Sequence, residues 1–590
     1  MKLDGVAARH GGTIDFQSLR FDPARHADQD TGSPASHPVV VVGAGPVGLS
    51  LAIDLAQRGV RVVLLDDDCT LSTGSRAICF AKRTLEIFDR LGCGQRMVDK
   101  GVSWSVGKVF FRDAQIYEFD LLAQAGREPA GPPRGRTPER EARGPTEQRP
   151  AFINLQQYYV EGYLAQRAAE LPLIDLRWKN KVVGIAQHAD HALLTIETPD
   201  GPYRLQADHV VACDGSRSTL RGLTGQESKG RVFHDRFLIA DVKMTLDRPA
   251  ERWFWFDPDF HPGQSVLLHM QPDGVWRIDF QLGWEADPEF EKKPENIIPR
   301  VKALLANSAM KDAKFELAWA SVYTFACTRM ARFRHGRVLF AGDAAHGVSP
   351  FGARGANSGV QDADNLAWKL ALVVKGDTGD ALLDSYAQER EYAADENILH
   401  STRATDFITP KSEISRIFRD AVLDLAKQHP FARTLVNSGR LSVPATLDAS
   451  PLNTPDSARF EGRMRPGAAA ADAPVTRADD TRSWLLRELG DGFTALVYGD
   501  AGAGRIAAEL QAAVDGLAPL KVLHVGPCTA DAHADAIDSV IDHDGLVAER
   551  YDLLPGSVYL LRPDQHVCAR WRQPSADALR AALKRALAMP

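Results

Sequence analysis

The sequence predicts a mixed α/β fold: a parallel-sheet domain, an antiparallel sheet inserted into it, and a separate C-terminal α/β unit. Three observations predict this arrangement. A run of valines leads into a glycine-rich turn and a helix near residue 40, aromatic runs alternate with turn residues between 232 and 285, and strand and helix signals alternate again after residue 480. A chain of 590 residues is long enough for roughly two to four such units.

The parallel-sheet domain begins with the turn of a Rossmann-like nucleotide site. Residues 39–42 are valines, which predict a buried strand, and a helix is predicted over 49–57. Gly43 permits a tight turn, Gly45 lets a pyrophosphate approach the backbone, and Gly48 lets the helix pack closely on the strand. The free N–H groups of the helix N-terminus then face the phosphates.

An acidic residue follows the next strand of this unit. The strand over 61–65 ends at Asp66, near the spacing expected for a carboxylate that binds a ribose hydroxyl. Asp67 and Asp68 would repel a 2′-phosphate, which disfavours NADP at this site, but the motif does not distinguish FAD from NAD. A similar turn over 499–507 has no acid after the strand that follows it, so we interpret it as a structural turn.

Two further glycine-containing motifs each follow a predicted strand. Residues 213–217 (CDGSR) follow the strand over 205–212, and residues 342–346 (GDAAH) follow the strand over 337–341 and lead into 350–357 (PFGARGAN). Ligands bind at the carboxyl ends of strands in open parallel sheets. A glycine-rich passage can also place backbone N–H groups against a polar edge. One long cofactor such as FAD would need contacts of all three kinds.

The inserted unit is predicted as an antiparallel sheet, because apolar and polar residues alternate in short runs between turns. These runs cover residues 237–242, 252–256, 265–270 and 276–280.

Other segments are predicted from composition. Residues 1–37 form a polar extension that is poorly ordered or peripherally packed, and residues 127–150, rich in Pro, Gly, Arg and Glu, form a mobile surface loop. A helix is predicted over 357–375, with Asn357 or Ser358 as its cap. The prolines and alanines before residue 476 indicate a linker.

The three motifs together resemble those of the group A flavoprotein monooxygenases, the FAD-dependent aromatic hydroxylases, over roughly residues 39–410. The resemblance is strongest to the phenol hydroxylase branch, including 3-(3-hydroxyphenyl)propionate hydroxylase-like enzymes, which add a thioredoxin-like C-terminal domain. It implies the following division: a discontinuous FAD-binding domain (39–110, 150–225, 325–410), a substrate domain (111–149, 226–324), a helical segment and linker (411–475), and a thioredoxin-like domain (476–590).

The resemblance also implies roles for individual residues. For catalysis it points to Pro350 beside the phenol and flavin, and to Arg76 and Asp214 on the nicotinamide path. It also implies a glutamine near the ribityl chain, which we assign to Gln157. The adjacent Gln156 leaves this assignment open by one position. The implied FAD contacts fall into groups. Gly43, Gly45 and Gly48 would hold the pyrophosphate, Asp66 the ribose, and Gln157 and Asp343, with Gly342 beside it, the ribityl chain. Gly352, Gly355, Ala356 and Asn357 would lie against the flavin ring, and Arg76 and Asp214 would also contact FAD.

The implied chemistry has two halves: NADPH or NADH reduces FAD, and reduced FAD captures O2 as a C4a-hydroperoxide that hydroxylates a phenol ortho or para to its hydroxyl. A base should help to deprotonate the phenol. Candidate bases on the inserted sheet are Asp241, His269, Asp279 and Tyr323, and His346 is expected to pack beside the flavin loop. Trp253 and Trp255 are candidates for an aromatic pocket wall.

Composition excludes several other classes of protein. A net charge of -7 and a pI near 6.2 disfavour nucleic-acid binding. The sequence has no secretory signal at its start and no apolar run long enough to span a membrane. The seven cysteines are scattered, which predicts a reduced cytoplasmic protein with no disulfide framework or zinc site. The expected partners are a small phenol and O2, with a homodimer as an open possibility.

Two alternative functions stay open at this point. A flavin-dependent halogenase is one, because residues 253–258 (WFWFDP) nearly match a halogenase signature, although Asp257 replaces its isoleucine. A flavin-binding sensor or assembly protein without catalysis is the other.

Overall fold

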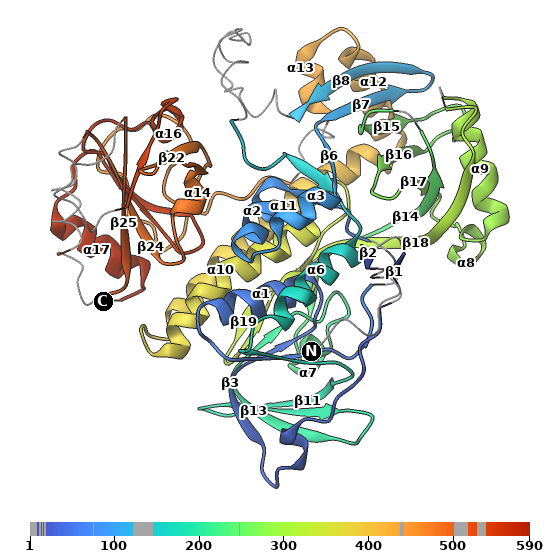
Figure 1. Cartoon of the computed structure of the whole chain (residues 1–590). Coiled ribbons are helices and arrows are strands. Elements are labelled where there is room, and N and C mark those ends of the chain that lie inside the picture. Colours follow the sequence, from blue (N-terminus) through green and yellow to red (C-terminus); the bar gives the residue numbers. More distant parts are fainter. Residues whose placement is uncertain are drawn as a thin grey trace.

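The computed structural model describes residues 9–10, 13–14, 16, 19–72, 74, 76–121, 146–246, 248–308, 310–436, 442–500, 512, 517–527 and 538–589. Figure 1 shows three units, with the C-terminal unit and the antiparallel sheet on opposite sides of the central domain. Most of the loop predicted over 127–150, and most of the turn predicted over 499–507, lie outside the described residues. Residues 146–150, the described end of the predicted loop, are held against the protein: Arg149 is buried, and its Nε donates to Asp89 over 2.6 Å.

The central domain is built on a largely parallel sheet. Strands β10, β4, β3, β13 and β20 run parallel in that order, while β12, β11 and β19 pair antiparallel at its margins. Helix α1 packs against α6 and α10. The elements are β3 (Ala35–Val42), α1 (Pro46–Gln57), β4 (Val62–Leu65), α6 (Gln157–Ala169), β10 (Ile174–Arg177), β11 (Lys181–Gln187), β12 (Ala192–Glu197), β13 (Tyr203–Ala212), α7 (Thr219–Leu223), β19 (Arg334–His335), β20 (Val338–Phe340), α10 (Gly355–Lys375) and α11 (Leu382–Ile408).

Part of the N-terminal extension belongs to this domain. Phe16, Leu19 and Phe21 are buried in its core, and the ring of Phe21 stacks on Trp178 at 4.2 Å. Strand β3 already begins at Ala35. The smaller elements here are β1 (Arg9–His10), β2 (Thr13–Ile14), the 3₁₀ helices η2 (Ala27–Asp30) and η3 (Gly342–Ala344), α2 (Lys82–Arg90), α3 (Gly94–Lys100), and a small sheet of β5 (Cys79–Ala81), β9 (Phe152–Asn154) and β6 (Val102–Trp104).

The inserted sheet contains the predicted strands in the order β21-β18-β14-β17-β16-β15-β7-β8. Among its described strands, only β7 and β15 pair in parallel. Because β7 belongs to this sheet, the boundary expected after residue 110 falls inside a strand. The elements are β7 (Val106–Phe111), β8 (Ala114–Asp120), β14 (Ser228–Met244), β15 (Arg252–Phe256), β16 (Ser265–Met270), β17 (Val275–Leu282), α8 (Pro288–Glu291), α9 (Pro294–Ala306), β18 (Phe315–Met330) and β21 (His346–Gly347).

Strand alternation gives this sheet two different faces. Apolar residues such as Trp276, Ile278 and Phe280 form one core with α9. Residues between them in sequence, such as Arg277 and Asp279, lie on the opposite face. The second face is turned toward the central domain, since Arg277 Nη1 donates to the backbone carbonyl of Arg76 over 3.4 Å.

The C-terminal unit has strands in the order β23-β22-β26-β25-β24-β27-β28, with β26, β25 and β24 parallel. The segment expected to be a linker is part of this unit: Thr454 N donates to Cys568 O and Ala470 N to Gln565 O. The elements of this unit are β22 (Pro474–Arg477), β23 (Arg482–Trp484), α14 (Leu485–Glu488), β24 (Phe493–Tyr498), β25 (Leu520–Gly526), β26 (Asp538–Ile541), α16 (Leu546–Tyr551), β27 (Val558–Leu561), β28 (Val567–Trp571) and α17 (Ala576–Ala586). Helices α12 (Glu413–Ala426) and α13 (Pro430–Leu435) precede this unit in the chain and pack beside β7 and β8 of the inserted sheet (Figure 1).

No helix among the described residues is both long enough and apolar enough to cross a membrane.

Candidate functional site

The parallel strands bring the three glycine motifs to one edge of the central sheet. Val42 pairs with Leu65 on β4 and with Ala212 on β13, and Ala212 in turn pairs with Phe340 on β20. The residues that follow these four positions therefore lie together at the carboxyl edge, where ligands bind in such sheets.

Two of the glycines in the first motif are required by protein packing, and one faces open space. A Cβ on Gly43, which has φ +105°, would lie 2.4 Å from Cys213 O. A Cβ on Gly48 would lie 1.9 Å from Gly43 O, so this glycine allows α1 to pack on the turn. A Cβ on Gly45 would meet no atom within 4 Å. Gly45 therefore leaves the N-terminus of α1 open to a ligand, as the sequence predicted.

Val47 in the first turn of α1 links the first motif to the third. A Cβ on Gly342 would lie 2.9 Å from Val47 Cγ2, and a Cβ on Gly359 would lie 2.7 Å from the same atom. Packing of Val47 against η3 and α10 thus already explains glycine at both positions. For Gly342 the structure shows this packing reason, and its contact with a cofactor stays a prediction.

Asp66 lies beside the glycine turn. Its Oδ2 accepts a hydrogen bond from Ala44 N over 2.6 Å, and its Oδ1 accepts one from Asp68 N over 2.8 Å. Burial raises the pKa of Asp66 to about 6, and the charges of Asp67 and Asp68 add to this effect while the N–H donors oppose it. Asp66 is therefore placed at the edge where the sequence analysis expected a ribose-binding carboxylate.

The Asp214 carboxylate is used to fix its own turn. Oδ1 accepts from Ser218 Oγ over 2.6 Å, and Oδ2 accepts from Leu220 N over 3.0 Å at the start of α7. Burial raises the pKa of Asp214 despite these donors. The structure thus gives Asp214 a local structural role, and its part in a nicotinamide path stays a prediction.

Arg76, Asp343 and Tyr323 are brought together from three separate regions of the chain. The charges of Arg76 and Asp343 both act on Tyr323, whose pKa is raised above its usual value mainly by burial. Asp343 is exposed in this structure, and desolvation by the surrounding protein raises the pKa of its carboxyl group. Arg76 is also exposed. Two of the implied cofactor contacts thus lie next to a residue of the inserted sheet.

The structure places the two candidate glutamines differently. Gln157 Oε1 accepts from Ala77 N over 3.2 Å, next to Arg76, and Gln157 Nε2 donates to Glu161 over 2.8 Å. Gln156 is buried and donates to Pro272 O of the inserted sheet over 3.2 Å. Gln157 is therefore the glutamine attached to the Arg76 segment.

The predicted flavin loop ends at the N-terminus of α10. Pro350 begins a turn that is closed by Ala353 N donating to Pro350 O. The predicted cap was wrong: α10 begins at Gly355 after Arg354, and Asn357 and Ser358 are buried inside the helix. Sequence periodicity did not locate the boundary, because the glycine-rich passage itself supplies the first turn of the helix.

Asn357 is committed to the protein by its side chain. Its Nδ2 donates to Cys79 O and Ala353 O, and its Oδ1 accepts from Ala81 N over 2.8 Å, which ties α10 to β5. Its backbone N–H lies in the first turn, where it has no acceptor within the helix. Together with the N–H groups of Gly355 and Ala356, it forms the open first turn of α10.

Sequence reasoning missed Asp362, which organises the third motif from inside α10. Its Oδ2 accepts from Gly342 N over 2.9 Å and lies 2.6 Å from His346 Nε2, while its Oδ1 accepts from Arg390 Nε. Although burial opposes its charge, His346 and Arg390 lower the pKa of Asp362. His346 also stacks on Phe333, so it packs beside the loop as expected. The only signal for Asp362 was its position in the run DADNLAWKL (362–370) that follows the loop.

The face of the inserted sheet turned toward the central domain holds three direct cross-strand rows. They are Arg252–His269–Arg277–Asp241–Trp319, then Phe254–Leu267–Asp279–Ile239–Ser321, then Phe256–Ser265 followed by Gln281–Phe237–Tyr323, where Ser265 N donates to Gln281 Oε1 over 2.9 Å. Phe351, next to Pro350, packs on this face, with its ring 4.8 Å from Phe237 and 5.6 Å from Phe325. The flavin loop and the sheet face therefore enclose one region.

The structure does not place Trp253 and Trp255 on the sheet face that contacts the central domain. Both belong to the opposite face of the sheet and pack with Phe110 in the core beside α9. Because side chains alternate along β15, the residues on the central face are Arg252, Phe254 and Phe256 instead. Alternation was predicted, but the sequence did not show which set faced the site.

The candidate bases have different surroundings. Asp241 is buried and paired with Arg277 through two bonds of 2.8 Å, so its carboxylate is already neutralised. Asp279 is partly exposed and lies 3.2 Å from Nε2 of the buried His269. Burial lowers the pKa of His269 to about 4, and the charge of Arg252 acts in the same direction. Among the described residues, the Tyr323 hydroxyl has no hydrogen-bond partner.

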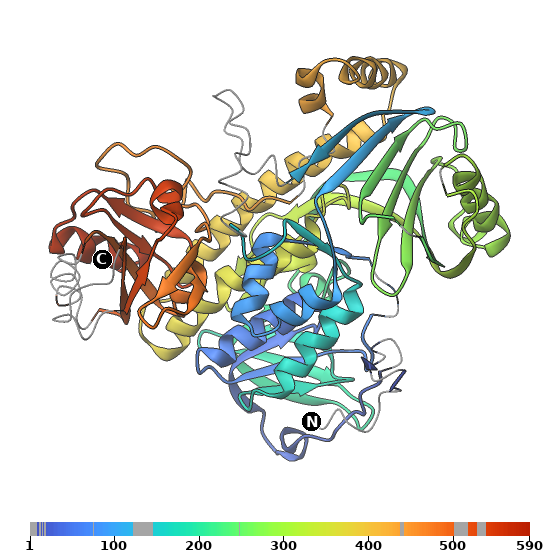
Figure 2. The ribbon, with the colours of Figure 1, turned by 45° about the horizontal axis from the view of Figure 1, so that its top comes forward.

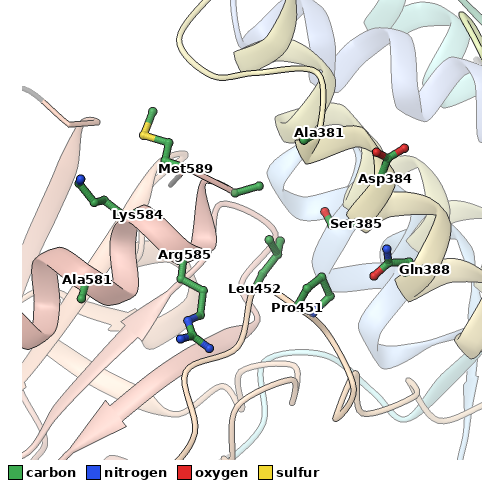
Figure 3. Close-up of a pocket in the computed structure, with 11 residues that line it drawn as sticks. Ala381, Asp384, Ser385, Gln388, Pro451, Leu452, Ala581, Lys584, Arg585 and Met589 are labelled. Carbon is green, nitrogen blue, oxygen red and sulfur yellow. The ribbon is translucent and has the colours of Figure 1, made fainter.

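A separate cavity of about 620 Å³ lies between α11, residues 451–452 and α17 (Figure 3). It is lined by side chains such as Asp384, Gln388 and Arg585, and by none of the three motifs. Its position between α11 and the C-terminal unit separates it from the three motifs, so we do not assign the candidate site to it.

The residues at the carboxyl edge fit FAD. The open N-terminus of α1 suits a pyrophosphate, Asp66 suits a ribose, and the first turn of α10 offers N–H groups to a polar ring edge. Asp343, exposed toward Arg76, suits the hydroxyl groups of the linking chain.

Comparison with known proteins agrees with this fit. The family model described as FAD binding domain matches residues 36–401. A 3-(3-hydroxy-phenyl)propionate/3-hydroxycinnamic acid hydroxylase of Mycolicibacterium smegmatis is 29% identical, with 90% of each chain covered. A 6-methylpretetramide 4-monooxygenase of Streptomyces rimosus is 30% identical over 92% of this chain and 93% of its own length.

Solved structures show the same fold. The flavin-dependent monooxygenase PieE, in complex with FAD and substrate, matches 95% of this chain and all of its own, with a TM-score of 0.77 and 22% identity. Aklavinone-11 hydroxylase, in a ternary complex with FAD and aklavinone, matches 94% of this chain and all of its own, with a TM-score of 0.72 and 24% identity. With its own three motifs gathered at one sheet edge, this chain belongs to the FAD-binding-domain family of group A flavin-dependent aromatic hydroxylases.

Proposed function

We propose that this protein is a monooxygenase that uses FAD, NADPH or NADH, and O2 to hydroxylate a phenolic compound ortho or para to its hydroxyl. The overall reaction converts phenol, O2, NAD(P)H and a proton into a diphenol, water and NAD(P)⁺. The observation that carries this proposal is the sheet face opposite the flavin loop, where accessible polar groups stand beside apolar walls. Relatives named as hydroxylases of phenolic compounds support it.

Asp279 and Tyr323 are the residues that we propose to hold the phenol hydroxyl. Asp279 keeps a partly exposed carboxylate, and Tyr323 has an unpartnered hydroxyl whose raised pKa keeps it protonated. The carboxylate can accept the proton of the substrate hydroxyl, and Tyr323 can donate a hydrogen bond to the oxygen. His269 lies behind Asp279 and acts as a positioning residue, because its ring is buried and contacts the carboxylate.

The remaining predicted site residues complete the proposal. The first turns of α1 and α10, together with Asp66 and Asp343, would hold FAD, which would supply the oxygen activation that side chains cannot. Arg76, exposed beside Asp343, is placed to contact FAD and an arriving nicotinamide. Pro350 and the apolar side chains around Phe351 exclude water from the reacting ring.

The test is a panel of simple phenols, resorcinols and phenolic acids, each assayed for stimulated NAD(P)H oxidation with product mass spectrometry under ¹⁸O2. We expect one class to give a product with a single labelled oxygen. The Asp279→Asn variant should lose roughly 100-fold in kcat for hydroxylation, in line with removal of a base. Asp259→Asn, an exposed change in the same domain, is the matched control. Wild-type activity in Asp279→Asn would remove Asp279 from the site.

The two alternative functions predict different results. A halogenase would give a chlorinated product only with added halide, but the tryptophans that suggested it face away from the site. A non-catalytic flavin protein would bind FAD and show no stimulated oxidation with any phenol. The named relatives are hydroxylases and monooxygenases, which favours hydroxylation.

We propose that a homodimer, if formed, uses helix α12. Ile414, Ile417, Phe418 and Leu425 are exposed along one side of this helix, and Figure 2 shows α12 and α13 at the periphery of the molecule. Glu413 near the start of α12 and Lys427 just after its end would meet in an antiparallel pairing with a second copy. Light scattering of Phe418→Glu beside wild type tests this, since only a dimer through α12 would dissociate. A cytoplasmic location stays a prediction.

A further inference from the structure

The turn between β27 and β28 inserts into the central domain. Residues 562–565 are almost completely buried, with Arg562 1% and Asp564 0% exposed, although they form the tip of a hairpin. Hairpin tips usually face solvent. We call residues 562–565 the hairpin tip. In Figure 1 the C-terminal unit sits beside α10 and α11, which is where the tip enters.

The hairpin tip carries two charges that are matched inside the protein. Arg562 Nη1 and Nη2 donate to the two carboxylate oxygens of Glu389 on α11, over 2.6 and 3.1 Å. Lys369 on α10 donates to the same Glu389 over 2.7 Å, and Arg562 Nε donates to Asp564 over 3.0 Å. Two cations and two carboxylates thus form a neutral buried group that spans both units.

Electrostatics shows that this group works as a unit. Burial disfavours the charged form of Glu389, but the charges of Arg562 and Lys369 outweigh burial and hold its pKa well below its usual value. Burial lowers the pKa of Lys369 to about 8, against the attraction of Glu389. Removing one partner of such a buried group leaves another charge uncompensated.

The hairpin tip also contacts α2, the helix that follows β5. Arg83 donates to Asp564 O over 2.6 Å and to Gln565 Oε1 over 3.2 Å, and Arg90 donates to Pro563 O over 3.3 Å. Gln565 has φ +53°, a conformation that favours glycine, but its side chain bridges Arg83 and Leu486 O. The tip is therefore bound to α2, α10 and α11 together.

Helices α2 and α10 are also joined near the flavin loop. Asn357, in the first turn of α10, bonds to Cys79 O and Ala81 N on β5, directly before α2. Further along α10, Asn365 donates to Asp564 Oδ2 over 3.2 Å and to Glu389 over 2.7 Å. The α2–α10 pair is thus fixed at one end by Asn357 and at the other by the hairpin tip.

We infer that the hairpin tip is part of the apparatus that positions the flavin site. The C-terminal unit holds α10 against α2 through Arg562 and Asp564, and this sets where the first turn of α10 presents its N–H groups. Arg562 and Asp564 are positioning residues, because neither reaches the carboxyl edge of the sheet. The C-terminal unit thus acts on the flavin site through its hairpin tip.

The experiment compares full-length Arg562→Met with Arg459→Met, an arginine of the same unit whose side chain is 88% exposed. Hydrogen exchange of the FAD-free proteins should show faster exchange in the peptides of α10 and α2 for Arg562→Met only. Fluorescence titration should show at least tenfold weaker FAD binding. At saturating FAD, the visible circular dichroism of the bound flavin should differ from that of wild type.

A second variant separates positioning from simple loss of folding. In Arg562→Met/Glu389→Met, both members of the pair are apolar, so less charge is left unmatched and FAD affinity should recover at least threefold relative to Arg562→Met. The inference is overturned if Arg562→Met keeps wild-type FAD affinity and flavin dichroism. It is also overturned if exchange increases only within the C-terminal unit.

Discussion

Alanine at Gly45 and alanine at Gly48 form a matched pair that separates cofactor binding from folding. Both positions lie in the same turn, and both gain one methyl group. At Gly45 the added Cβ has no atom within 4 Å, and the backbone is extended with φ -74°, which alanine adopts without strain. At Gly48 the added Cβ lies 1.9 Å from the backbone oxygen of Gly43, which cannot rotate away.

The expected magnitudes follow from these contacts. Gly48→Ala should lower the free energy of unfolding by about 1–3 kcal/mol, since the helix must shift to relieve the clash. Gly45→Ala should leave the FAD-free protein within about 1 kcal/mol of wild type. Its methyl group occupies the path of the pyrophosphate to the N-terminus of α1. Loss of one charged hydrogen bond there, worth about 1.5–3 kcal/mol, corresponds to roughly 10- to 100-fold weaker FAD binding.

The assays are urea unfolding of the FAD-free proteins and fluorescence titration with FAD. A Gly45→Ala protein that binds FAD as tightly as wild type would refute the placement of the pyrophosphate at α1. A Gly48→Ala protein as stable as wild type would refute the packing argument. Equal loss of stability in both variants would show that the turn tolerates no substitution for reasons unrelated to the ligand.

Three further predictions concern two buried titratable residues and one tryptophan on the α9 side of the inserted sheet. Glu389→Gln should lower the free energy of unfolding by about 3–5 kcal/mol at neutral pH. Because the pKa of Glu389 in the folded protein lies below the usual 4.5, wild type should lose this contribution as pH falls below 4.5. Urea unfolding should therefore show a weaker dependence of stability on acidic pH in the variant than in wild type. The pKa of His269 is lowered from 6.5 to about 4, so between these pH values the folded protein keeps His269 neutral while the unfolded chain binds a proton. The free energy of unfolding should therefore fall by up to about 3 kcal/mol from pH 6.5 to 4. His269→Phe should abolish this part of the pH dependence. Trp255→Phe should leave KM for the phenol within about twofold of wild type, since the residue packs beside α9; a tenfold rise in KM would contradict this placement.

The sequence predicted the parts of the site that depend on local backbone geometry. The turn at Gly43–Gly48, the strands that end at Leu65, Ala212 and Phe340, and the hairpin of β27 and β28 all follow from neighbouring residues. Glycine spacing and β-branched runs are local signals, because they reflect the conformation of a few consecutive residues. For the same reason, the family resemblance carried by these motifs was correct.

The candidate substrate site was less predictable, because each assignment there depended on which face of a strand is covered. Trp253 and Arg252 are adjacent in sequence, but α9 covers one and the central domain faces the other. Asp241 and Asp279 are both acids on one face, and only the tertiary contact with Arg277 shows that Asp241 is already paired.

By itself, the sequence determined the fold class and the order of the three motifs, since both rest on signals from neighbouring residues, and the family resemblance that these motifs carry indicated FAD. Only the tertiary structure decided that Asp279 lies on the same sheet face as Arg277, that Asn357 bonds to β5, and that Arg562 enters the central domain. These contacts join residues tens to hundreds of positions apart. Their energies depend on burial and on the charge of the partner, which local sequence does not specify.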